Sequence, residues 1–176
     1  MGNLPSSRTE TCINGAPVNP NLINEIQDNI IGGNRAPFVR SIWPVILSLP
    51  SGTWAKGDTG ATLFTPYIQC GGANNQVVLE IPCEKGETIT SLTADVFGPG
   101  GVQTTSYTLY YSPSGIGSEV SIGGLNDVNR AAAWGTFTIQ GGMSQLIGAG
   151  GALYLFAQGQ TGYRISKMHG TFSRLP

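Results

Sequence analysis

The chain has 176 residues, 26 of them glycine, with 11% charged residues and a formal net charge of −1. A typical soluble domain has about 25% charged residues and about 7% glycine. The near-neutral charge gives no basic field for nucleic acid, no apolar run reaches the roughly 18 residues of a membrane span, and the polar N-terminus does not resemble a signal peptide. We therefore expect no nucleic-acid partner, no membrane segment and no signal peptide. Few charges and many turn residues favour an all-β fold.

Residues 1–36 are predicted to form an N-terminal arm with one short helix. The first twenty residues are polar and rich in proline, which disfavours a regular element. Asn19 can cap a helix over about 20–31, with Pro20 in its first turn and Gly32 and Gly33 at its end. The helix has one apolar stripe, made of Leu22, Ile23, Ile26 and Ile30. Because so short a helix is unstable alone, we expect the stripe to pack on the sandwich or on another subunit, as a docking or oligomer interface.

Residues 37–176 are predicted to form one β-sandwich domain. Strands are expected at 41–49, 62–70, 76–81, 88–97, 104–111, 134–140, 152–158 and 163–172. In the fourth of these, Leu92, Ala94 and Val96 alternate with polar residues, as in a strand with one buried face. Segment 112–133 is expected to be mainly loop, with one short strand near residue 120, and 143–147 to be a turn or short helix. The pattern predicts an antiparallel β-sandwich or jelly roll.

The sequence shows no motif for catalysis, a cofactor or a metal. His169 is the only histidine, and no Gly-x-Ser-x-Gly elbow accompanies it. Cys70 and Cys83 match no zinc pattern; they either pair across neighbouring strands or remain two reduced, mostly buried thiols. We therefore predict no enzyme activity, no cofactor and no metal site. A pair of carboxylates brought together only by the fold is the remaining catalytic alternative.

Two aromatic residues are candidates for a ligand-binding surface. Trp54 lies in the loop-like stretch 52–57, and Tyr110 falls on the face of its strand that carries Thr108. Exposed rings of this kind can form a platform on which a sugar stacks. Aromatic residues in a sandwich also pack in the core or at its rim, so both alternatives stay open.

Two stretches resemble segments of known proteins. The stretch VNPNLINEIQDNIIGG, residues 18–33, resembles a lead-in near the start of tailed-phage appendage proteins and phage-like bacterial proteins. The stretch IPCEKGETITSL, residues 81–92, followed by YTLY at 107–110, resembles the turn and hairpin of small jelly-roll domains in the same proteins. Together they cover about a fifth of the chain. The resemblance implies a virion protein, such as a head fibre, a capsid decoration protein or a tail appendage, which often trimerises.

Two functions follow as hypotheses. The first is a non-catalytic structural protein on the surface of a phage particle, docked to other virion proteins through its arm, displaying the sandwich, and homo-oligomeric, with a trimer favoured. The second is a carbohydrate- or receptor-binding β-sandwich module with a host-surface glycan as its partner. The two are compatible in a phage appendage.

Overall fold

The structure is a computed structural model that describes residues 12–13, 16–17, 37–58, 66–100, 104–114, 117–128 and 132–174. The regular elements among these residues are all strands, and the described part of the chain contains no helix that could cross a membrane. The strands are β1 (Cys12–Ile13), β2 (Ala16–Pro17), β3 (Phe38–Ile42), β4 (Ile46–Ser51), β5 (Trp54–Asp58), β6 (Pro66–Cys70), β7 (Asn75–Ile81), β8 (Glu87–Phe97), β9 (Thr104–Ser112), β10 (Val120–Val128), β11 (Trp134–Gln140), β12 (Gln145–Leu146), β13 (Ala152–Gly159) and β14 (Arg164–Arg174).

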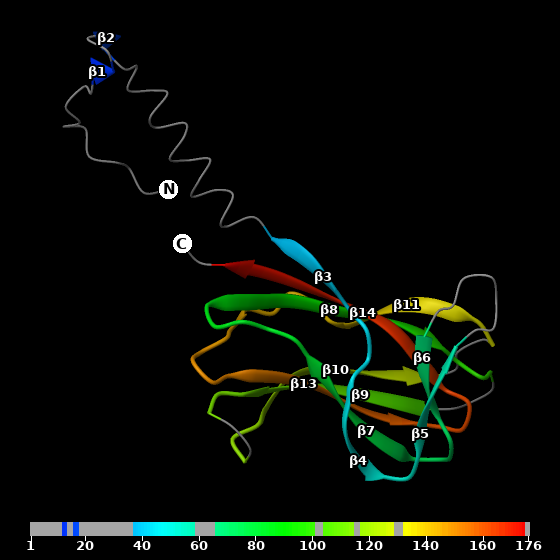
Figure 1. The fold of residues 1–176 in the computed structure, drawn as a ribbon. Helices are drawn as coiled ribbons and strands as arrows, with labels where there is room; N and C mark the ends of the chain where they lie inside the picture. The colour runs from blue at the N-terminus through cyan, green and yellow to red at the C-terminus, as the bar shows by residue number, and fades with distance from the viewer. Residues whose placement is uncertain are drawn as a thin grey trace.

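Two antiparallel sheets face each other as the layers of a sandwich (Figure 1). The β14 sheet has the order β11-β8-β14-β6-β5, with β3 beside β14 and β12 beside β8, and the β13 sheet has the order β10-β9-β13-β7-β4. Eight of these strands form two facing four-stranded layers, with the order β6-β14-β8-β11 in one and β7-β13-β9-β10 in the other. This is the strand order of a jelly roll. The prediction of an all-β antiparallel sandwich is confirmed.

The core lies between the sheets and follows the alternation of side chains along each strand. In β13, Leu153, Leu155 and Ala157 are fully buried, whereas Tyr154 and Phe156 are only partly buried. Neighbouring residues of a strand point to opposite faces, so the latter two side chains lie on the outside of the sandwich. Fully buried apolar side chains come from both sheets, among them Ile68, Ile89, Leu92, Phe172, Leu79, Ile81, Leu109, Leu153 and Leu155. Burying a side chain of this size stabilises the fold by about 1.5–3 kcal/mol.

The run predicted as one strand over 41–49 is two strands in different sheets. β3 pairs with β14, and β4 pairs with β7 in the other layer. Trp43, Pro44 and Val45 connect them, and Pro44 has no N–H for a ladder. The apolar run therefore reflects a crossover between the sheets and not a single buried strand.

The stretch predicted as mainly loop contains the nine-residue strand β10, which pairs with β9. Its glycines hid it from the sequence pattern, because glycine is disfavoured in strands. Gly124 is needed there, since a Cβ at this position would lie 2.5 Å from the Tyr107 carbonyl oxygen. The turn or helix predicted over 143–147 is also wrong, because Gln145 and Leu146 form β12 and pair with β8.

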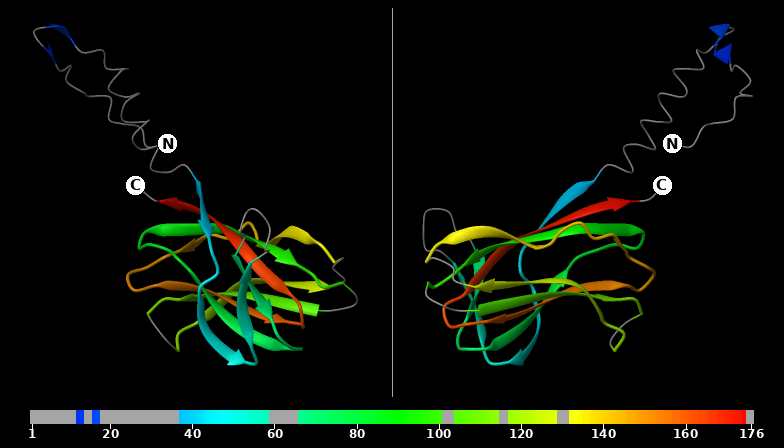
Figure 2. Two further views of the ribbon diagram at one scale, coloured as in Figure 1. Left: turned by 45° about the vertical axis from the view of Figure 1, so that its right-hand side comes forward. Right: turned by 180° about the vertical axis from the view of Figure 1, so that it is seen from behind.

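The predicted helix over about 20–31, with its stripe of Leu22, Ile23, Ile26 and Ile30, lies outside the described residues. Of the predicted arm, the structure describes a small antiparallel pair of strands, β1 and β2. The sandwich begins with β3 and ends with β14. Both views of Figure 2 show the end of β14 beside the start of β3, in agreement with the pairing of Phe172 with Phe38. The described sandwich thus has its first and last strands together at one end.

Candidate functional site

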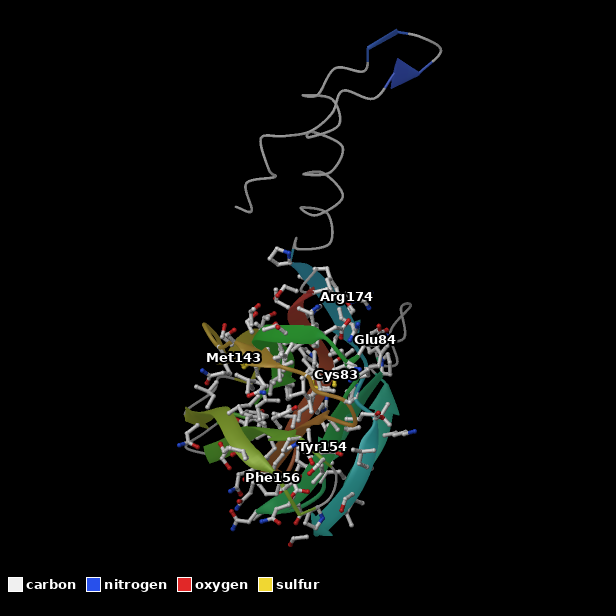
Figure 3. The ribbon with its side chains drawn as sticks, turned by 90° about the vertical axis from the view of Figure 1, so that its left-hand side faces the viewer. Cys83, Glu84, Met143, Tyr154, Phe156 and Arg174 are labelled. Atoms are coloured by element: carbon white, nitrogen blue, oxygen red, sulfur yellow. The ribbon has the colours of Figure 1, made fainter. Side chains whose placement is uncertain are left out.

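The outer face of the β13 sheet carries a row of aromatic side chains. Tyr154 of β13 lies directly opposite Tyr110 of β9 in the strand register, and opposite Glu80 of β7 on its other side. Phe156 lies two residues further along β13, between Thr108 of β9 and Val78 of β7 (Figure 3 labels Tyr154 and Phe156). Side chains directly opposite on neighbouring strands have Cβ atoms about 4.5–5.5 Å apart. Tyr110, Tyr154 and Phe156 therefore occupy neighbouring positions on this face.

This surface forms the wall of a hollow with a volume of about 580 Å³. Its described lining consists of Leu47, Ser48, Val78, Tyr110, Glu119, Tyr154 and Phe156. The volume lies within the range of about 300–1,000 Å³ that small-molecule sites occupy, and a mainly apolar lining with a few polar groups is also typical of such sites.

A second hollow of about 370 Å³ adjoins the first and shares Leu47 and Tyr154 with it. It continues along β7 and β13 to Glu80, Ile81, Pro82, Cys83, Gly151, Ala152 and Leu153. We call the two hollows together the aromatic groove. Because the shared residues stand where the hollows meet, the aromatic groove follows the direction of the strands across the outer face.

The edge strand β4 supplies one side of the aromatic groove. Its pairing with β7 has two irregularities, between Ile46 and Ser48 and between Ser48 and Ser51. The side chains of Leu47 and Leu49 remain 48% and 44% exposed. Edge strands with such irregularities often bend away from regular pairing. Here the edge strand leaves apolar side chains available beside the aromatic row.

Glu119 is fixed at the other side of the aromatic groove as a carboxylate. The backbone N–H of Gly117 donates to both of its oxygens, at 3.0 Å each. This hydrogen bond, together with one from its own backbone N–H, lowers the pKa of Glu119 below its ordinary value. Hydrogen bonds to the charged form favour ionisation. The aromatic groove therefore contains an anion at neutral pH.

No protein-family model and no curated protein matches the sequence. Among solved structures, the chain is similar to the C-terminal CBM6 of a marine laminarinase from Zobellia galactanivorans, at 9% identity and a TM-score of 0.49 over 76% of this chain and 99% of that one. It is also similar to a carbohydrate-binding module of Cellvibrio mixtus lichenase 5A in complex with cellotriose, at 13% identity and a TM-score of 0.45 over 78% and 98% of the two chains. A family 11 carbohydrate-binding module from Clostridium thermocellum, in complex with a mixed-linked tetrasaccharide, gives 7% identity and a TM-score of 0.43 over 81% and 90%. Similarity at this level concerns the arrangement of the strands and does not identify a ligand of this chain.

Of the two aromatic residues predicted for a ligand surface, the structure places Tyr110 in the aromatic groove. The prediction for Trp54 is wrong, because its side chain is only 5% exposed and belongs to the core. Trp54 starts β5 opposite Cys70, and its ring lies over Gly159, where an added Cβ would come within 2.9 Å of it. The surrounding glycines and turn residues made this stretch look like a loop.

Tyr154 and Phe156 were not identified from the sequence. The signal was present, because Leu153, Leu155 and Ala157 alternate with them along β13. Reading the stretch as a uniformly apolar strand concealed that two of its rings point outward. The predicted docking residues Leu22, Ile23, Ile26 and Ile30 lie outside the described residues, so their role stays a prediction.

Cys70 and Cys83 are free thiols. Cys70 is buried, and its Sγ donates to the Gly72 carbonyl oxygen at 3.0 Å. Burial raises the pKa of both Cys70 and Cys83. The sequence left open whether Cys70 and Cys83 pair or remain reduced, and in the structure both are reduced thiols.

The outer face of the β14 sheet also carries aromatic rings, but an arginine side chain packs on them. The Arg164 guanidinium carbon lies 4.9 Å from the centre of the Tyr67 ring and 4.8 Å from that of Phe97. Its Nε donates to the Gln69 side-chain oxygen at 2.9 Å. Trp134 packs against both rings, with centroids 6.2 and 5.6 Å away. Because the side chains of this cluster contact each other, the aromatic groove is the better candidate for a site.

Proposed function

We propose that the chain is a carbohydrate-binding β-sandwich that holds an oligosaccharide in the aromatic groove. The observation that carries this proposal is the row of Tyr110, Tyr154 and Phe156 along the wall of a hollow of about 580 Å³. Aromatic rings supply a large apolar surface, and tyrosine adds a polar end. A pyranose has matching chemistry, with apolar C–H faces and hydroxyl groups around its edge.

The polar groups of the aromatic groove complement the rings. Ser48 and Glu119 line the first hollow and Glu80 the second. Carboxylates accept hydrogen bonds at two oxygens, and a serine hydroxyl both donates and accepts. Such groups can bind the hydroxyls of a sugar whose ring packs on Tyr154. The proposed role is non-catalytic: the aromatic groove holds the sugar and does not transform it.

A glycan array followed by calorimetric titration of the bound sugars tests this proposal. We expect Tyr154→Ala and Tyr110→Ala each to weaken binding at least about fivefold, because truncating a central aromatic contact costs about 1 kcal/mol or more. The matched control is Trp134→Ala, which removes an exposed ring from the opposite outer face. The absence of any bound glycan, or equal binding by both tyrosine variants and the intact protein, would contradict the proposal.

A structural role on a phage particle is a second proposal, favoured by the placement of the strand ends. The start of β3 and the end of β14 lie together at one end of the sandwich (Figure 2). The aromatic groove lies on the outer face of the other sheet. A particle attached at that end would leave the aromatic groove uncovered. Deleting residues 1–33 should give a folded sandwich that no longer joins the particle, and light scattering of the full chain should give a trimer. Incorporation of the truncated chain would refute this role.

A further inference from the structure

We propose that the aromatic groove selects a linear amino-sugar chain, an oligosaccharide with several protonated amino groups. This inference rests on the carbohydrate-binding function proposed above and adds the chemical class of the ligand. It combines three properties of the aromatic groove: the sign of its charge, its length along the strands, and the position of its rings relative to its carboxylates.

The described charges of the aromatic groove are negative in both of its parts. Glu119 lines the first hollow and is held as an anion by the Gly117 N–H. Glu80 lines the second hollow and is exposed. Among the described lining residues of both hollows, none is lysine or arginine. A polyuronate or a sulfated chain would meet repulsion here, whereas an ammonium group would meet attraction.

The described arginines nearest these strands have partners of their own. Arg40 reaches the second hollow, where its Nη1 donates to the Pro82 carbonyl oxygen at 2.6 Å, but its guanidinium is paired with the buried Glu87. Arg164 lies between aromatic rings on the opposite outer face. Lys167 lies over the Trp43 ring, with its Nζ 5.7 Å from the ring centre. Because the charge of Arg40 is paired with that of Glu87, we expect it to offset little of the negative charge of Glu80 and Glu119.

The aromatic groove is long enough for a chain of sugars. Its wall on β13 extends from Phe156 through Tyr154 to Ala152. Four residue steps along a strand correspond to about 13 Å. This length accommodates a short row of linked pyranose rings and not only a single sugar.

A carboxylate and two rings lie side by side across the strands. Glu80, Tyr154 and Tyr110 occupy one cross-strand row, from β7 through β13 to β9. An ammonium group on a sugar stacked at Tyr154 would lie between a ring face and a carboxylate. A cation near an exposed aromatic face gains about two- to fivefold in affinity, and an exposed ion pair about 1.4- to fivefold. Both contributions favour the amino sugar over its neutral counterpart.

The test compares four β-1,4-linked trimers by calorimetric titration with the full chain: glucosamine, N-acetylglucosamine, glucose and mannuronic acid. At about pH 6 the amino groups are protonated. We expect the glucosamine trimer to bind at least about fivefold more tightly than the glucose trimer and the mannuronic acid trimer to bind most weakly. Single glucosamine should bind more weakly than the trimer.

Variants assign the preference to the two carboxylates. Glu80→Gln and Glu119→Gln should each reduce binding of the glucosamine trimer about 1.4- to fivefold more than they reduce binding of the glucose trimer, which loses only a hydroxyl contact and no ion pair. Asp95→Asn is the matched control, because it removes the same charge from the outer face of the β14 sheet, where Asp95 contacts His169 and Thr136. An equal effect of Asp95→Asn would mean that only net charge matters and would overturn the inference.

The remaining outcomes separate this inference from the proposed function. If the glucose trimer binds, Tyr154→Ala abolishes that binding and the glucosamine trimer shows no advantage, the inference is wrong and the carbohydrate-binding function stands. If mannuronic acid binds as tightly as glucosamine, the inference is wrong too. If none of the four trimers binds and the glycan array is blank, both proposals fail.

Discussion

Arg40 of β3 forms a two-point ion pair with Glu87 at the start of β8, with Nη2–Oε1 and Nη1–Oε2 distances of 2.7 and 3.0 Å. The Glu87 side chain is fully buried. It also accepts hydrogen bonds from the Glu84 backbone N–H at 2.8 Å and from the Arg174 guanidinium at 3.0 Å. The Arg40 guanidinium carbon lies 4.7 Å from the centre of the Phe172 ring. One buried carboxylate thus connects the first strand of the sandwich, its last strand and β8.

Replacing Glu87 with glutamine should destabilise the sandwich by about 1.5–3 kcal/mol, the usual value of hydrogen bonds to a charged group. The variant keeps the shape of the side chain and leaves two arginines without their buried anion. Denaturant unfolding gives the free-energy difference. Glu84→Gln is the control: the Glu84 carboxylate also pairs with Arg174 but is 65% exposed, so its loss should cost less than about 1 kcal/mol. Equal costs for the two variants would show that burial of the pair is unimportant.

The same carboxylate predicts how stability depends on pH. Burial would raise the pKa of Glu87, but the hydrogen bonds from Arg40, the Glu84 backbone N–H and Arg174 outweigh it, so the pKa is lowered. The unfolded chain therefore binds this proton at higher pH than the folded chain. The stabilisation is fully present above the unfolded pKa of about 4.3 and is lost as pH falls through the lower, folded pKa. Unfolding measured between about pH 7 and pH 3 should show this loss. Glu87→Gln should have a flatter profile, and an identical slope would contradict the assignment.

The alternation along β13 predicts that truncating neighbouring residues lowers the stability of the sandwich by different amounts. Leu155 is fully buried, whereas Phe156 lies partly exposed in the aromatic groove. Leu155→Ala should cost about 2–5 kcal/mol, as for other large buried aliphatic residues. Phe156→Ala should cost less than about 1.5 kcal/mol, because its ring is only partly removed from water. Thermal and denaturant unfolding of both variants measures the two losses. A larger loss for Phe156→Ala would mean that Phe156, and not Leu155, points into the core.

The predictable part of the fold was the part encoded by short-range alternation. Leu92, Ala94 and Val96 alternate with polar residues, because one face of their strand is buried and the other is polar. This alternation was sufficient to predict the strand. β10 was missed because Gly123 and Gly124 lower strand propensity, and Gly124 is required by its close approach to the Tyr107 backbone. That requirement comes from neighbouring strands and is not visible locally.

The candidate site was predictable only for the residue whose strand alternates clearly. Tyr110 alternates with buried Leu109 on a strand of mixed polarity, so its outward direction could be inferred. Tyr154 and Phe156 stand among other apolar residues, where composition gives no direction. Their meeting with Tyr110 depends on the pairing of β9 with β13, two strands separated by some forty residues of chain. Such pairing is a property of the jelly-roll topology and not of either segment.

The two tryptophans that follow β3 should differ sharply in their contribution to stability. Trp54 is 5% exposed and packs over Gly159, whereas Trp43 is 48% exposed in the connection between the sheets. Trp54→Ala should cost about 3–5 kcal/mol, since it leaves a cavity between β5 and its neighbours. Trp43→Ala, which removes a half-exposed ring and its cation contact with Lys167, should cost about 1 kcal/mol or less. Denaturant unfolding compares the two variants, and glycan titration of the folded fraction should show that neither changes the affinity of the aromatic groove. A stable Trp54→Ala variant with impaired glycan binding would instead support the sequence-based hypothesis that Trp54 is part of a ligand-binding surface.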